Sequence, residues 1–270
     1  MPLDEMPFYT SVASFGRTRP ATKSAFASVA LSSLKAQVTE GISTLREVVL
    51  MPRDVFSVIP AKVEQEDDVV VLVHGFFASA GVWRPMKRAL ANATGAKVAS
   101  FTHAPGVGID RIARSLARIV EGIPAGCRIH LVGHSLGGIV SRYYVQELGG
   151  HARVSQTISL GSPFGGTERA DPFPFLIGRE LCRTSPVLAR LRSRAHEHDV
   201  PHTSFVGEGD LMVVPAASAV FPRGELVIVP RCGHNTLLFH SESIARVVEC
   251  VRVTQDNARR ERSAHARAEL

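Results

Sequence analysis

A serine between two glycines is the residue of this chain that is best placed to act as a nucleophile. The run Gly133-His134-Ser135-Leu136-Gly137 follows an apolar, β-branched segment over residues 128–132 and precedes a helical pattern. It matches the GxSxG strand-to-helix turn, in which a strained serine presents its hydroxyl above a sheet. The glycines let neighbouring backbone approach this turn closely. The first amides of the following helix, beginning with Leu136, predict half of an oxyanion hole beside Ser135.

A base and an acid must accompany the serine, because a bare hydroxyl is a poor nucleophile and a histidine needs a partner that fixes its tautomer. Alone, the pentapeptide also fits an ordinary glycine-rich connection. In this motif's usual setting the order is serine, acid, histidine. Asp210 follows an expected strand over residues 203–206, and His234 follows another over residues 225–229. Because the carboxyl ends of parallel strands meet at one sheet edge, we expect the three side chains to converge.

Other acids and histidines compete for these roles. Glu208 lies two residues before Asp210, but the glycine on each side of it and the hydrophobic run after Asp210 favour Asp210. Among the eleven histidines, we interpret His134 as a packing residue of the elbow and His240 as the start or cap of the last helix. His234 is preferred because it follows a strand at the expected place in the chain order.

The second half of the oxyanion hole should come from the loop after an early strand. Residues 69–73 form an unbroken apolar run, which is typical of a strand buried on both faces. The run ends in His74-Gly75-Phe76, where Gly75 permits a tight turn and the backbone N–H of Phe76 is the expected second donor. Phe77 would make the mouth of the site apolar.

These motifs resemble, in order, the signatures of the α/β-hydrolases, specifically bacterial triacylglycerol lipases and related esterases. The resemblance spans roughly residues 66–251 and rests on His74-Gly75-Phe76, Gly133-His134-Ser135-Leu136-Gly137-Gly138, Arg142-Tyr143-Tyr144, Ser159-Leu160-Gly161-Ser162-Pro163-Phe164-Gly165-Gly166-Thr167, Asp210 through Val214-Pro215, and Gly233-His234-Asn235. It implies a serine hydrolase whose triad is Ser135, Asp210 and His234, with the amides of Phe76 and Leu136 as oxyanion donors. The longer lid, disulfide and calcium site of the larger secreted lipases have no clear counterpart in this sequence.

Strand-like and helix-like segments alternate through the middle of the chain, which predicts an α/β fold of the α/β-hydrolase type, a mostly parallel doubly wound sheet with helices on both faces. The expected strands cover residues 69–73, 97–101, 128–132 and 154–160, and the expected helices cover residues near 82–93, 109–121 and 136–148. Residues 167–202, with four prolines, interrupt the alternation. We interpret them as a cap or short lid over an acyl pocket, the alternative being a surface loop with one helix. The expected pocket residues are Phe77, Phe164, Phe173, Phe175 and Leu176.

The 270 residues suffice for one large core. We expect a hydrolase domain over residues 61–253, an N-terminal extension over residues 1–60 and a polar tail over residues 254–270. Apolar residues at spacings of three to five between positions 24 and 50 predict an amphipathic helix in the extension. Docking against the hydrolase body is favoured over membrane binding, because the polar face of the helix has few Lys and Arg.

The composition and charge of the chain limit which partners and which cellular location are expected. Apolar content of 45% and charged content of 21% are typical of a soluble globular protein. No run approaches the roughly 20 apolar residues of a membrane span, and the N-terminus lacks the pattern of a signal peptide, so a cytoplasmic protein is expected, with export by another route left open. The net charge of +6 comes without a nucleic-acid motif, so no nucleic-acid partner is expected. Peripheral contact with an anionic lipid surface is the alternative to a solvated basic face.

The four cysteines have no metal-binding spacing, and we expect neither a metal nor a cofactor. Cys127 and Cys250 are expected to be small core residues. A disulfide between Cys182 and Cys232 is the less favoured alternative to free thiols.

The expected reaction is hydrolysis of a small-molecule or lipid ester through an acyl-enzyme intermediate. The same triad could serve an acyltransferase or a thioesterase. A non-catalytic binding module on a hydrolase fold is a further alternative, because a fold alone does not establish activity.

Overall fold

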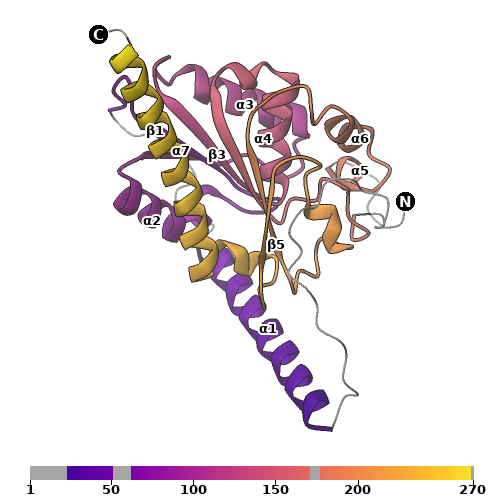
Figure 1. Cartoon of the computed structure of the whole chain (residues 1–270). Coiled ribbons are helices and arrows are strands. Elements are labelled where there is room, and N and C mark those ends of the chain that lie inside the picture. Colours follow the sequence, from indigo (N-terminus) through magenta and orange to yellow (C-terminus); the bar gives the residue numbers. More distant parts are fainter. Residues whose placement is uncertain (1–22, 51–61, 171–176, 269–270) are drawn as a thin grey trace.

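The computed structural model describes residues 23–50, 62–170 and 177–268. Within them, six parallel strands form one sheet in the order β2-β1-β3-β4-β5-β6 (Figure 1). The strands are β1 (Asp68–Val73), β2 (Lys97–Phe101), β3 (Arg128–His134), β4 (Val154–Leu160), β5 (His202–Gly207) and β6 (Glu225–Val229). The α-helices are α1 (Lys23–Leu50), α2 (Arg84–Thr94), α3 (Ile109–Glu121), α4 (Leu136–Glu147), α5 (Ile177–Leu181), α6 (Pro186–Ser193) and α7 (Ser241–Ala268). Short 3-10 helices are η2 (Ala80–Trp83), η3 (Gly150–Ala152), η4 (Ala216–Ala219) and η5 (Asn235–Leu238). The predicted α/β fold with a parallel sheet is confirmed.

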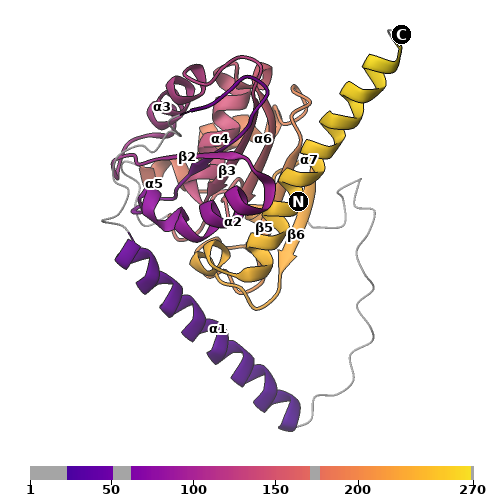
Figure 2. The ribbon, with the colours of Figure 1, turned by 90° about the vertical axis from the view of Figure 1, so that its left-hand side faces the viewer.

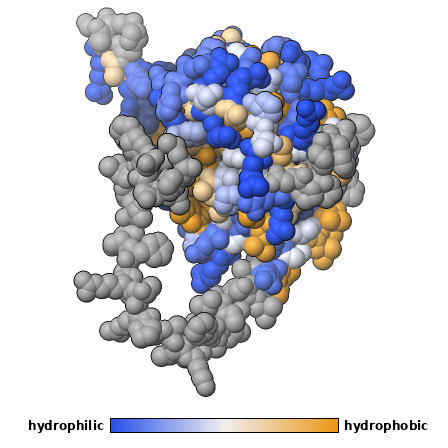
Figure 3. Space-filling view, turned by 90° about the vertical axis from the view of Figure 1, so that its right-hand side faces the viewer, coloured by the Kyte–Doolittle hydropathy of each residue, from blue (hydrophilic) through white to orange (hydrophobic). Residues whose placement is uncertain are grey.

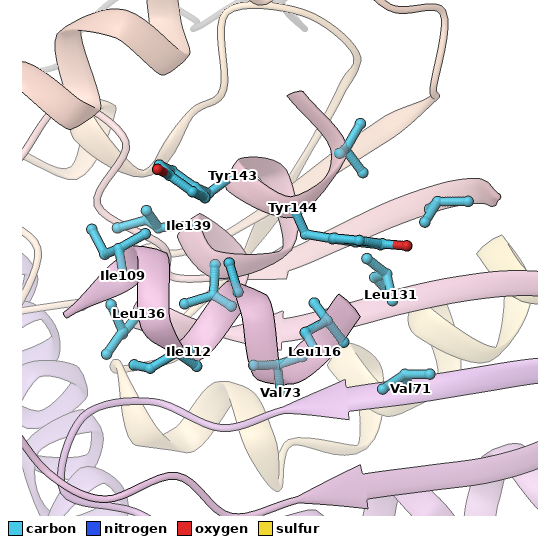
Figure 4. Close-up of a cluster of buried hydrophobic side chains, with 14 of the residues drawn as sticks. Val71, Val73, Ile109, Ile112, Leu116, Leu131, Leu136, Ile139, Tyr143 and Tyr144 are labelled. Atoms are coloured by element: carbon cyan, nitrogen blue, oxygen red, sulfur yellow. The ribbon is translucent and has the colours of Figure 1, made fainter. Parts of the chain in front are cut away.

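Helices cover both faces of the sheet, as the apolar run of β1 requires. Val69, Val71 and Val73 point into a core shared with α3 and α4, whereas Val70 and Leu72 point into a second core shared with α2 and α7. This division follows from the alternation of side chains along a strand. Figure 4 shows the first core, in which valines of β1 lie under Ile109, Ile112 and Leu116 of α3. Because β1 is buried on both sides, its residues 69–73 lack a polar face.

The segment expected to form a cap contains two short helices, which rest on the body. Leu181 of α5 and Leu188 and Leu191 of α6 belong to the same core as α4. A carboxylate oxygen of Glu180 accepts a hydrogen bond from the Ile109 amide at 2.7 Å. Figure 3 faces the side on which α5 and α6 lie in Figure 1; hydrophilic residues cover most of its upper part, and hydrophobic residues gather toward its lower edge. Residues 171–176 lie outside the described part of the chain.

The helix expected in the N-terminal extension is present, and its contacts with the body come from its polar side. α1 contacts η5 and η2, and Figure 2 shows this helix alongside the rest of the fold. Ser43 and Leu50 are buried there, and Glu40 and Glu47 are half-buried. The outward stripe is apolar and more than half exposed, comprising Val38, Ile42, Leu45, Val48 and Val49. The apolar stripe that predicts the helix is therefore not the face with which it docks.

At the other end of the chain, α7 continues through most of the expected polar tail, to Ala268. Its first turns pack in the core with Val247 and Val251. Gln255 then donates a hydrogen bond to Asp68 at the start of β1. No helix within the described ranges is long and apolar enough to span a membrane.

Candidate active site

Ser135 stands at the sharp turn between β3 and α4. Its backbone has φ 51° and ψ −120°, a conformation that residues other than glycine rarely adopt. Such a conformation is strained. The Ser135 amide donates to the carbonyl of Leu160 on the neighbouring strand at 2.8 Å, which holds the turn in place. A side-chain carbon at Gly137 would overlap the carbonyl of Val73, so this glycine is required by close packing of backbone. The geometry is that of a nucleophile elbow.

His234 and Asp210 form a buried pair above the same sheet. The Nδ1 atom of His234 lies 2.7 Å from Oδ2 of Asp210. The other carboxylate oxygen, Oδ1, accepts the amides of Met212 at 2.8 Å and Val213 at 2.9 Å. With both oxygens engaged, the Asp210 carboxylate is fixed in orientation and holds a proton on Nδ1 of the imidazole. That tautomer leaves Nε2 as the atom able to accept a proton.

The pKa values of the pair move in opposite directions. Burial alone would raise the pKa of Asp210, but the hydrogen bond from His234, its charge and the two backbone amides bring the pKa below its usual range. Burial alone would lower the pKa of His234, but the hydrogen bond to Asp210 and the negative charges of Asp210, Glu40 and Glu47 raise it. A carboxylate that stays ionised beside a basic imidazole is the electrostatic arrangement that a general base needs.

The residues that compete for the acid and base roles, Glu208 and His134, have other hydrogen-bond partners. Glu208 is exposed, and its carboxylate accepts the amide of Arg231. His134 is buried, and its Nε2 donates to the carbonyl of His234 at 3.1 Å. Burial, then the charge of His234, lower the pKa of His134 to about 3, so this imidazole is neutral at neutral pH. His134 thus packs in the elbow and also supports the backbone of His234, a contact that its sequence position does not reveal.

The turn after β1 lies against the elbow. A side-chain carbon added to Gly75 would stand 3.1 Å from Cβ of Ser135, so Phe76 follows directly after a residue in contact with the serine. Leu136 is the first residue of α4, and the first amides of a helix have no acceptor inside it. Both expected oxyanion donors therefore belong to segments adjoining Ser135.

Two neutral histidines hold this turn. The rings of His74 and His103 stack with centroids 3.9 Å apart. The His103 amide donates to Nε2 of His74 at 3.1 Å, and Nδ1 of His74 donates to the carbonyl of Gly75 at 2.7 Å. Burial lowers the pKa of His74 to about 3 and also lowers that of His103. Sequence reasoning overlooked His103, although it follows β2 directly and thus shares the functional edge of the sheet.

The expected pocket residues have different surroundings. Phe77 is 63% exposed, whereas Phe164 is fully buried between His202 and Phe221 and belongs to the core. Phe173, Phe175 and Leu176 lie outside the described residues. Leu211 and Met212 belong to the hydrophobic run after Asp210 and were not expected in the pocket, but their side chains are exposed next to Asp210.

His202, buried inside the sheet, lies within hydrogen-bond distance of two hydroxyl groups. His202 contacts Oγ1 of Thr157 at 2.7 Å and Oγ of Ser159 at 3.1 Å. All three side chains are buried, and burial holds the pKa of His202 well below its usual range. This group therefore ties β4 to β5 and offers no access for a substrate.

The described residues include no cluster of three or more His, Cys, Asp or Glu able to hold a metal ion. Cys182 and Cys232 are free thiols, as are Cys127 and Cys250. Cys250 packs against the second core, as expected, but it is partly exposed because it lies on the side of α7 near the edge strand β6.

Residues 68–177 match the family profile of the alpha/beta hydrolase fold. The mature lipase of Bacillus licheniformis superposes with a TM-score of 0.60 and 17% identity, over 73% of this chain and 98% of that one. For lipase B of Aspergillus fumigatus the TM-score is 0.61 with 18% identity, over 73% of this chain and 56% of that one. The thioesterase domain from the curacin biosynthetic pathway gives 0.51 with 14% identity, over 69% of this chain and 91% of that one. A search of curated proteins finds no sequence match.

The matched region runs from β1 through the elbow and β4 to the start of α5, and the two lipase structures each cover 73% of this chain. The chain therefore has the α/β-hydrolase fold, and its structure is similar to those of bacterial and fungal lipases.

Proposed function

We propose that this protein is a serine hydrolase that cleaves carboxylic esters, with Ser135, Asp210 and His234 as its catalytic triad. The observation that carries the proposal is the buried His234–Asp210 pair at 2.7 Å, at the same sheet edge as the strained Ser135 elbow. Those two features together meet the needs of nucleophilic catalysis: a partly exposed serine, a base and an acid that orients the base.

In the proposed reaction, Nε2 of His234 takes the proton of Ser135 as its Oγ attacks the ester carbonyl carbon. The carbonyl oxygen becomes an oxyanion, which accepts the amides of Phe76 and Leu136, each worth about 2.7–4 kcal/mol in the transition state. The alcohol leaves with the proton from His234, so Ser135 carries the acyl group. Water then gives a proton to His234 and attacks the acyl carbon. The bond between that carbon and Oγ breaks, the acid leaves, and His234 returns the proton to Oγ of Ser135.

We propose an acyl chain of apolar character as the substrate's acid part. Support comes from the exposed side chains of Phe77, Leu211 and Met212, which adjoin the oxyanion turn and Asp210. Such apolar surface around a site favours a lipid acyl ester over a charged substrate, and it also supports peripheral contact with a lipid surface. The four free thiols support a place in the reducing cytoplasm.

A thioester substrate is the second candidate, because the thioesterase domain of the curacin pathway shares the fold with a TM-score of 0.51. Thioesters pass through the same acyl-enzyme intermediate. The two candidates therefore differ in the leaving group and share the three triad residues.

The test compares wild type, Ser135→Ala and the exposed control Ser193→Ala on p-nitrophenyl esters of graded chain length and on matched acyl thioesters. We expect Ser135→Ala alone to lose turnover by at least about a thousandfold. Labelling with a fluorophosphonate and mapping the adduct by mass spectrometry should place it on Ser135. Equal ester hydrolysis by wild type and Ser135→Ala would disprove the assignment.

A further inference from the structure

Glu40 of the N-terminal helix α1 accepts hydrogen bonds from the loop that carries His234. Its Oε1 accepts the Asn235 amide at 2.7 Å, and its Oε2 accepts the Thr236 amide at 3.0 Å. Oε2 also accepts the Thr236 hydroxyl at 2.7 Å. The two amides belong to the two residues directly after His234. One carboxylate from almost 200 residues earlier in the chain therefore receives three hydrogen bonds from this loop.

The contact continues on both sides of His234. A side-chain carbon at Gly233 would overlap Oε2 of Glu40, so the glycine before His234 packs directly on this carboxylate. Ser43, one turn further along α1, lies 3.2 Å from the Thr236 hydroxyl, and Thr44 accepts a hydrogen bond from the Asn235 side chain. The polar side chains of Glu40, Ser43 and Thr44 therefore contact residues 233–236.

His234 itself is held from two sides. Nε2 of His134, in the elbow, donates to the His234 carbonyl, and α1 fixes the amides that follow. The imidazole keeps its distance to Asp210 only while this backbone stays in place, because His234 has few rotatable bonds between backbone and ring. A displacement of about 1 Å in a catalytic group costs on the order of a hundredfold in rate.

We propose that Glu40 is a positioning residue of the active site, which holds the His234 loop so that the imidazole faces both Asp210 and the nucleophile. The proposal rests on the proposed function, in which His234 is the base. It assigns a part of the catalytic apparatus to the N-terminal helix, which precedes the matched fold region.

The negative charge of Glu40 also affects the pKa of His234, which an uncharged contact would not change. The titratable groups that face His234 are Asp210, His134, Glu40 and Glu47. Asp210 raises the pKa of His234 most, and Glu40 and Glu47 raise it further. Removing the charge of Glu40 should therefore lower the pKa of His234, so that the base stays unprotonated to lower pH.

The experiment uses the full chain with Glu40→Ala and Glu40→Gln. The controls are Thr39→Ala, whose exposed side chain donates to the Lys35 carbonyl within α1, and Glu121→Gln, an exposed acid at the end of α3. Four quantities are measured: amide exchange at Asn235 and Thr236, the NMR titration of the His234 imidazole, kcat and KM on p-nitrophenyl butyrate, and the pH profile of kcat/KM. Circular dichroism verifies folding.

For Glu40→Ala we expect at least about tenfold faster exchange at both amides and a kcat lower by about 10- to 100-fold, with KM within about threefold. Glu40→Gln keeps one acceptor oxygen, so it should recover part of kcat and of the exchange protection. Both variants should lower the pKa of His234 and move the acid limb of kcat/KM to lower pH. Both controls should match wild type.

The outcomes separate the two hypotheses. If wild type hydrolyses esters through Ser135 while Glu40→Ala matches it in exchange, titration and kcat, the positioning role is wrong and the proposed function stands. If wild type has no Ser135-dependent activity but both amides and the His234 titration respond to Glu40→Ala, the hold on the loop is confirmed and the proposed function fails. A Glu40→Gln variant that folds yet leaves the His234 titration unchanged would also contradict the proposal.

Discussion

Nδ1 of His234 lies 2.7 Å from Oδ2 of Asp210, and the other oxygen of this carboxylate accepts two backbone amides. The relationship makes Asp210, and not its neighbour Glu208, the residue that sets the tautomer of the imidazole. An asparagine at this position would keep the shape and lose the charge. We expect Asp210→Asn to lower kcat by about 10³- to 10⁴-fold while the protein stays folded.

Asp210 also raises the pKa of His234, so the variant's remaining activity should persist to lower pH than that of wild type. The sign follows because a base works only when unprotonated. The matched control is Glu208→Gln, which should retain wild-type kcat, since its carboxylate faces Arg231. A loss of activity in Glu208→Gln with little effect of Asp210→Asn would reverse the assignment.

Gly161, at the end of β4, offers a steric test of the same pair. It has φ +59°, and a side-chain carbon there would stand 3.0 Å from Nδ1 of His234 and 3.1 Å from Oδ2 of Asp210. Gly161→Ala should therefore displace the pair by a few tenths of an ångström and lower kcat by about tenfold. Gly95→Ala is the control, because Gly95 has φ +67° but no atom within 4 Å of the added carbon. It should lose about 1 kcal/mol of stability and no activity; a similar loss of kcat in both variants would show that backbone strain is the cause.

Much of this site was predictable because its parts are local. The elbow needs its glycines within five residues, and the buried strands produce apolar runs such as residues 69–73. The motif predicts the chain order of Asp210 and His234. Their convergence is predicted because parallel strands end at one edge of the sheet, and the structure brings the two residues together there.

What sequence reasoning missed depends on contacts between distant segments. Glu40 meets Thr236 across a separation of 196 residues, and no spacing rule connects them. The stripe of Val38, Ile42, Leu45 and Val49 predicted α1, but this stripe is exposed in the structure. The helix docks instead through its polar side, where one carboxylate accepts three hydrogen bonds from the body.

Glu47 makes the stability of the protein depend on pH near neutrality. Burial, opposed by the charge of His234 and reinforced by Glu40, raises the pKa of Glu47 from 4.5 to about 7. Because the folded state favours the protonated form, the free energy of unfolding should fall as pH rises from about 4.5 to about 7. Glu47→Gln removes this dependence, so at pH 8 it should be more stable than wild type by about 1–3 kcal/mol.

Urea unfolding of Glu47→Gln and wild type at pH 5 and pH 8 measures the effect. The difference should be present at pH 8 and nearly absent at pH 5. Glu261→Gln, an exposed acid on α7, should match wild type at both pH values. A constant difference between Glu47→Gln and wild type across the range would contradict the raised pKa.

Asp68 ties the far end of the sheet to α7, well away from the proposed chemistry. Its carboxylate accepts hydrogen bonds from Arg128 at 2.6 and 2.7 Å, from His130 at 3.0 Å and from Gln255 at 2.9 Å. Burial alone would raise its pKa, but the hydrogen bonds from His130, Arg128 and Gln255 outweigh burial and hold the pKa well below its usual range. The stabilisation is therefore present above the unfolded-state pKa of about 4 and is lost as pH falls below it.

Asp68→Asn should lower the free energy of unfolding by about 3 kcal/mol at pH 7, because it leaves buried donors without a charged acceptor. The difference from wild type should narrow at pH 3, because the unfolded wild-type chain takes up a proton at Asp68 that the folded state, with its lowered pKa, does not. Asp199→Asn removes an exposed partner of Arg223 and should cost less than about 1 kcal/mol. Urea unfolding at both pH values distinguishes the two sites, and an Asp68→Asn protein as stable as wild type at pH 7 would show that the network contributes nothing to folding. Ester hydrolysis by folded Asp68→Asn should stay at the wild-type rate, since Asp68 lies at the opposite end of β1 from the turn that adjoins Ser135.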